Sequence, residues 1–145
     1  MVELPDDLKA LKRFHGHLGP YVVVGFRMGV LARSKLKGRL KAVSFSGSKT
    51  PLSCIIDGVQ FSSQCTMGKG NITVTEAEDA KVQFMDDKNL MEISLLEDVK
   101  EIIDTSMGRE TEEELALKVF EEKETNLFRV TTVDRSPLAT RVKLR

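Results

Sequence analysis

The chain has only two cysteines, two histidines, one tyrosine and no tryptophan among its 145 residues. Two cysteines are too few for the disulfide scaffold of a small secreted protein. The longest apolar stretch, Leu18 to Ala32, contains Arg27 and is too short to span a bilayer, so we expect no membrane segment. No basic and apolar leader opens the sequence, and we therefore expect a cytoplasmic protein.

The length suits a single domain covering residues 1–145, with 41% hydrophobic residues for a core and 30% charged residues for its surface. Charge is spread unevenly. Residues 1–70 carry 11 basic and 4 acidic side chains, a net +7, whereas residues 71–145 carry 11 and 18, a net −7. The basic excess is either a solvated surface, a site for an anionic ligand or a contact between copies of the chain. No aromatic residue interleaves with the basic run 33–41, so we expect no nucleic-acid binding.

Hydrophobic periodicity and turn residues predict ten elements in the order α-α-β-α-β-β-β-α-α-β. The expected helices cover about 5–15, 20–36, 51–65, 95–107 and 111–124, and the expected strands cover about 40–46, 72–76, 81–86, 90–94 and 127–133. This order indicates an α+β domain with helices packed on a mostly antiparallel mixed sheet.

The segment 20–36 is apolar nearly all round, which predicts a central buried helix. Gly25 and Gly29 lie one turn apart on it and would allow another backbone to approach closely. Because a chain of this size has few ways to cover such a helix, we expect a homodimer with a largely apolar interface.

Three helix starts carry capping signals. Thr50 and Pro51 form an expected N-cap and N1 pair, which would place Cys54 near the third or fourth helical position. The segments 94–97 and 111–114 each read as a capping box, with Ser or Thr followed by Glu three residues later.

All the histidines and cysteines fall between positions 15 and 65. His15 and His17 flank Gly16 at a break between two helices, where side chains two residues apart can reach one ion. The alternative is that each histidine caps a helix or satisfies a buried polar group. Cys54 lies in the first turn of a helix, so we expect a lowered thiol pKa and a nucleophile or ligand, or otherwise a small buried hydrophobe.

Cys65 follows Cys54 by eleven residues, or about 16 Å along a continuous helix, too far for one shared ion. We therefore expect Cys65 to be structural or part of a second site. Asp57 and Gln60 lie on the same side of that helix as Cys54. The segment 68–71 fits a phosphate-binding loop poorly and reads better as a tight turn with a solvated lysine.

Together these blocks resemble the FmdE-like family of formylmethanofuran dehydrogenase proteins. The resemblance covers about residues 10–76, half the chain, and rests on these blocks: His15-Gly16-His17, Arg27-Met28-Gly29, Cys54 with Asp57 and Gln60, and Cys65-Thr66 with Gly68-Lys69-Gly70-Asn71. Longer relatives carry a C-terminal zinc module of four cysteines, whereas this chain has no cysteine after Cys65, so it looks like the core domain.

The resemblance implies an α+β core, a homodimer and a Cys/His site for zinc or another divalent metal. It also implies a link to formylmethanofuran dehydrogenase or to other molybdenum or tungsten enzymes of C1 and molybdopterin metabolism. The candidate metal ligands are His15, His17 and Cys54. His17 and Cys54 are also the candidate catalytic pair, and the candidate cofactor-binding residues are Asp57, Gln60, Lys69 and Asn71.

One departure from the family pattern matters, since Leu18 stands where the family has a cysteine. With one ligand fewer, we expect a weakly held metal whose removal leaves the melting temperature nearly unchanged. Three functions stay open: an accessory protein with a pocket for a metal ion or an anionic cofactor, an enzyme that uses Cys54 as nucleophile with a histidine base, and a non-catalytic dimeric scaffold.

Overall fold

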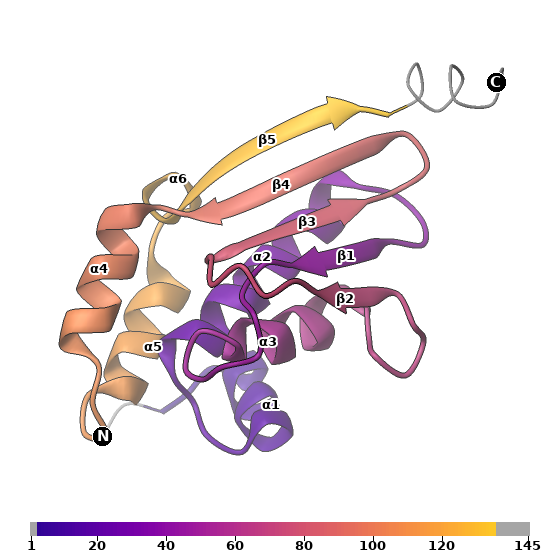
Figure 1. The fold of residues 1–145 in the computed structure, drawn as a ribbon. Coiled ribbons are helices and arrows are strands. Elements are labelled where there is room, and N and C mark those ends of the chain that lie inside the picture. Colours follow the sequence, from indigo (N-terminus) through magenta and orange to yellow (C-terminus); the bar gives the residue numbers. More distant parts are fainter. Residues whose placement is uncertain (1–2, 136–145) are drawn as a thin grey trace, which may run out of the picture.

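The computed structural model describes residues 3–135. Within them six helices lie against one face of a five-stranded sheet (Figure 1). The helices are α1 (Asp6–His15), α2 (Pro20–Lys35), α3 (Cys54–Ser63), α4 (Glu97–Ser106), α5 (Glu112–Glu121) and α6 (Glu124–Leu127), and the strands are β1 (Lys41–Ser44), β2 (Ile72–Val74), β3 (Lys81–Met85), β4 (Asn89–Leu95) and β5 (Phe128–Asp134). The predicted fold class and element order are confirmed, with the short α6 as an addition.

The sheet has the strand order β2-β1-β3-β4-β5. Only β1 and β2 pair in parallel, and the other three pairings are antiparallel. Ala42, Phe84 and Met91 lie side by side on neighbouring strands, and all three are buried. Strand residues alternate between faces, so this row forms the floor of the core beneath the helices. Within the described part of the chain, no helix has the length and apolarity needed to cross a membrane.

Helix α2 is the centre of the helical layer, with eleven of its residues buried. Two glycines explain how closely α3 packs on it. A Cβ added at Gly25 would lie 2.1 Å from the Ile55 carbonyl oxygen, and one at Gly29 would lie 1.9 Å from Ser62 Oγ. The expected close approach is therefore confirmed. Because one chain already covers α2, its apolar surface does not require a second copy, and the homodimer stays a prediction.

Arg27 fixes the position of α5 relative to α2. Its Nη1 donates hydrogen bonds to the carbonyl oxygens of Val119, Phe120 and Glu122 at 2.8, 3.0 and 2.7 Å. These are carbonyls at the end of α5, where a cation also opposes the negative end of the helix dipole. The opposite end of α5 is thereby held beside the loop that follows α1.

The helix starts differ from expectation. Residues 50–53 form a turn, so α3 begins at Cys54 with Ser53 as its N-cap, and the expected Thr50–Pro51 start is wrong. Residue 94 belongs to β4, so the capping box at 94–97 is also wrong. Thr111 is the N-cap of α5 as expected, but its side chain makes no cap bond.

Cys65 lies outside α3, which ends two residues before it. Gln64 adopts a left-handed conformation after the last helical residue, Ser63, so the expected continuous helix from Cys54 to Cys65 is wrong. The Cys65 side chain is fully buried in the hydrophobic core.

Candidate metal centre

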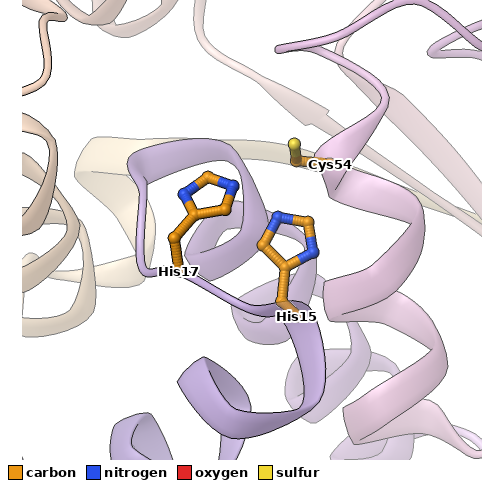
Figure 2. Close-up of side chains that lie close together, drawn as sticks. All are labelled: His15, His17 and Cys54. Atoms are coloured by element: carbon orange, nitrogen blue, oxygen red, sulfur yellow. The ribbon is translucent and has the colours of Figure 1, made fainter.

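Three side chains from different segments meet beside the first turn of α3. His15 is the last residue of α1, His17 lies in the loop before α2, and Cys54 is the first residue of α3. One possible ligand atom from each lies within 4.8 Å of the other two. Figure 2 shows the two rings side by side, with Cys54 close to both. A metal ion could therefore bind all three residues with small side-chain adjustments.

The turn at Gly16 brings the two rings together. Gly16 has φ of 101° and its N–H donates to the Lys12 carbonyl oxygen at 2.7 Å, which ends α1 in a left-handed cap. Glycine adopts this conformation without a steric penalty. The chain reverses there, and the His15 and His17 ring centroids lie 4.5 Å apart.

A carboxylate orients each histidine. His15 Nδ1 lies 2.6 Å from Asp57 Oδ2, and His17 Nδ1 lies 3.1 Å from Glu112 Oε1. An ionised carboxylate only accepts hydrogen bonds, so each Nδ1 carries the proton and each Nε2 keeps a lone pair in the neutral ring. The second nitrogens turn toward the space between the rings (Figure 2). This arrangement is typical of metal-binding histidines.

His15 Nε2 is the clearest sign of a ligand. Among the described residues it is the one buried side-chain nitrogen or oxygen without a hydrogen-bond partner. Native proteins rarely leave such an atom unpaired, because its lost hydration is not replaced. An ion between the rings would use this lone pair.

Cys54 is half-buried, and its thiol pKa is raised rather than lowered. Burial is the main cause, and the negative charges of Asp57 and Glu112 add to it. The expectation of a helix-activated thiolate is therefore wrong, because desolvation and two carboxylates outweigh the helix dipole. The same carboxylates favour a cation, and a bound metal deprotonates a coordinating thiol.

The alkylation rate of Cys54 by iodoacetamide is expected to rise only at a pH above that of an unhindered cysteine, about 8.5. A Cys65→Ala variant isolates the signal, and mass spectrometry at a series of pH values measures it. Asp57→Asn should move the midpoint down, because it removes a negative charge near the sulfur. Cys54 should still react before the buried Cys65 in the unmodified chain. A midpoint below that of free cysteine would contradict this picture.

The three donors open onto a cavity of about 40 Å³. That volume suits an ion with one small ligand. The described residues that line it are His15, His17, Gly19, Pro20, Tyr21, Val22, Pro51, Cys54, Met107 and Glu112. Leu18 is not among them, since its side chain is only 1% exposed and belongs to the core.

The other candidate cofactor-binding residues lie outside this cavity. Gln60 accepts from the Met67 N–H at 2.8 Å and its Nε2 lies 3.4 Å from Asp57 Oδ1, so it supports the residue behind His15. Asn71 closes the turn that follows α3, accepting from the Thr66 N–H at 2.8 Å. Lys69 is an exposed member of that turn.

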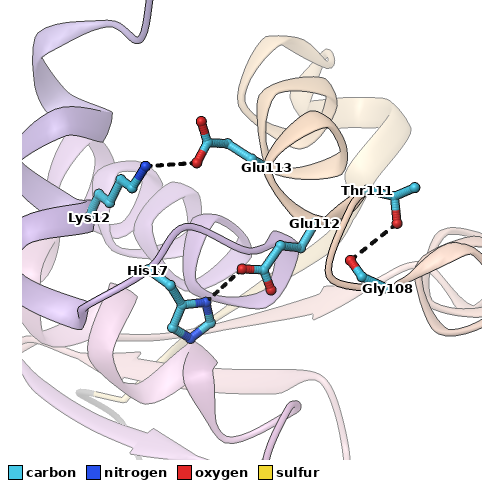
Figure 3. A network of polar contacts seen from close by, with 6 residues as sticks. All are labelled: Lys12, His17, Gly108, Thr111, Glu112 and Glu113. Carbon is cyan, nitrogen blue, oxygen red and sulfur yellow. Dashed lines mark hydrogen bonds and ion pairs between the residues drawn. The ribbon is translucent and has the colours of Figure 1, made fainter.

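Sequence reasoning missed Glu112 and Met107. Figure 3 shows the start of α5 beside the histidine loop, where Glu112 contacts His17 and Glu113 pairs with Lys12 at 2.9 Å. Glu112 is 95 residues from His17 in the chain. Its only sequence signal is an acidic first turn, which most helices tolerate for the helix dipole alone.

Comparison with known proteins agrees with this arrangement. A family model described as "FmdE, Molybdenum formylmethanofuran dehydrogenase operon" matches residues 14–139. A probable S-adenosyl-L-methionine-binding protein of Archaeoglobus fulgidus is 36% identical over 66 residues, which make up 42% of this chain and 18% of that protein. This chain thus spans less than a fifth of that curated relative.

A solved structure has a similar fold. The crystal structure of an FmdE-like protein of tungsten formylmethanofuran dehydrogenase from Syntrophus aciditrophicus matches with a TM-score of 0.61 and 21% sequence identity. The match covers 88% of this chain and 70% of that one. At this identity it establishes the fold alone.

Proposed function

The chain belongs to the FmdE family, and on that premise we propose that it is a metal-binding protein whose ligands are His15, His17 and Cys54. The observation that carries the proposal is the buried, unpartnered Nε2 of His15, which faces the other donors. The family link alone would support only a general association with metalloenzymes. The donor geometry supports a specific site.

The residues present fit a divalent transition metal such as zinc. Two imidazole nitrogens and one thiolate are ligands that zinc prefers, and three protein donors with one open position are typical of catalytic or exchangeable sites. Asp57 and Glu112 orient the rings from behind. When bound, zinc would supply Lewis-acid chemistry in the cavity.

A metal-free nucleophile is the weaker proposal. Nucleophilic catalysis by cysteine needs a thiolate, and the pKa of Cys54 is raised by burial and by two carboxylates. Both histidines also direct Nδ1 to a carboxylate instead of holding it as a base for the sulfur. The arrangement therefore supports a ligand better than a nucleophile.

We propose that the protein is accessory to a molybdenum or tungsten enzyme, such as formylmethanofuran dehydrogenase. The family description and the fold shared with the FmdE-like protein of the tungsten enzyme support this role. The cytoplasmic location and the homodimer remain proposals of the same kind.

Titration of the metal-free protein with Co²⁺ and then Zn²⁺ tests the metal site. We expect one ion per chain and release of about one proton per ion at neutral pH, because the Cys54 thiol must ionise to bind. A thiolate-to-cobalt absorption band reports the sulfur ligand, and calorimetry in two buffers counts the protons. The protein should be purified without a histidine tag. Absence of binding at micromolar protein would refute the proposal.

A further inference from the structure

A second sulfur lies on the wall of the metal cavity. Met107 lines it together with His15, His17 and Cys54, and it is partly buried against the hydrophobic core. It stands just after α4, at the start of the turn that leads into α5. Its thioether is a soft donor, like the thiolate of Cys54.

The turn that carries Met107 is tied to the site. Thr111 Oγ1 lies 2.9 Å from the Ser106 carbonyl oxygen and 3.3 Å from that of Gly108, which holds the two ends of the turn together (Figure 3 draws the second contact). The next residue, Glu112, contacts His17 Nδ1 at 3.1 Å. The position of Met107 is therefore coupled to that of a metal ligand.

The other polar side chains on the cavity wall already have partners. The Tyr21 hydroxyl donates to Asp104, and Glu112 orients His17. Neither Asp57 nor Glu112 belongs to the group of donors within 4.8 Å of one another. Met107 is then the lining residue best placed to take a fourth position on an ion.

We infer that Met107 supplies a fourth, thioether ligand and that it makes the site take Cu(I). This inference rests on the proposed function, because it needs the site formed by His15, His17 and Cys54. Two imidazoles, a thiolate and a thioether are a donor set for copper, and thioether ligands select Cu(I). Zinc binds imidazole, thiolate, carboxylate and water instead. With zinc, Met107 contributes nothing and the fourth position stays open.

The experiment compares Met107→Leu with the unmodified protein in two competition titrations under anaerobic conditions. One uses Cu(I) against a chromophoric Cu(I) chelator, and the other uses Zn²⁺ against a zinc chelator. Leucine keeps the apolar volume and removes the sulfur. Met67→Leu is the matched control, because Met67 is 63% exposed in the turn beyond the other end of α3.

We expect Met107→Leu to weaken Cu(I) binding on the order of tenfold or more, since even residues outside the ligand sphere cost a metal site that much. Zinc affinity should stay within about threefold, and Met67→Leu should change neither. X-ray absorption of the Cu(I) complex should lose one of two sulfur scatterers in Met107→Leu.

Equal losses for both metals would mean that Met107 acts by packing, and no loss would mean that it is not a ligand; either result overturns the inference. Failure of the unmodified protein to bind Cu(I) while it binds zinc also overturns it and leaves the proposed function intact. Failure to bind either metal refutes the proposed function itself.

Discussion

Replacing Gly58 by alanine is expected to destabilise the protein by about 3 kcal/mol or more, at the upper end of overpacking effects. A Cβ at this position would lie 2.0 Å from the Val22 carbonyl oxygen and 2.5 Å from the Phe26 backbone nitrogen. Both are backbone atoms of α2, so the helices themselves would have to separate. Urea denaturation monitored by circular dichroism measures the change.

Two other glycines calibrate this result. Gly68→Ala should be nearly neutral, because no atom lies within 4 Å of its added Cβ. Gly29→Ala should be intermediate, because its nearest neighbour is the mobile end of the Ser62 side chain, although the Ser63 nitrogen lies at 3.0 Å. A loss below about 1 kcal/mol for Gly58→Ala would show that α2 and α3 pack less tightly than described. Since α3 carries Cys54, the same variant should also disturb the metal centre.

Replacing His15 by alanine is expected to lower the affinity for Zn²⁺ at least about 100-fold, because it removes a ligand with a side chain only 9% exposed. Competition with a zinc chelator measures the affinity, and circular dichroism checks that the variant is folded. An affinity within threefold of the unmodified protein would place the metal elsewhere.

The carboxylates give a graded test that depends less on folding. Asp57→Asn and Glu112→Gln should each weaken zinc about 10- to 100-fold, because each loses the group that keeps the proton on Nδ1. Glu113→Gln is the matched control: it alters the neighbouring residue, which pairs with Lys12 and does not line the cavity. An equal effect of all three would indicate a general loss of negative charge.

Much of the fold could be predicted from local pattern. Alternation and turn residues predicted the strands, and the apolar segment 20–36 predicted a central helix, because both signals depend on neighbours in the chain. The spacing of Gly25 and Gly29 predicted close approach. Helix starts were less predictable, because residues 50–53 carry good capping residues and still form a turn.

The site was predictable only in part. The break at Gly16 and the family pattern pointed to His15, His17 and Cys54, which the structure brings together. The raised pKa of Cys54 depends on burial and on Glu112, which comes from a distant part of the chain. A local argument from the helix dipole therefore gave the wrong direction. Met107 carried no signal, because a lone methionine is usually core.

The carboxylates behind the histidines have a consequence for ion exchange. Metal-free, the centre combines two negative charges with a protonated thiol, so its proton occupies the place of a cation. A monovalent ion that displaces this proton leaves the local charge unchanged, whereas a divalent ion makes it more positive by one. Uptake of either ion should weaken as the medium acidifies, since protons and metal ions compete for the same sulfur. The centre is thus a cation exchanger whose resting occupant is hydrogen.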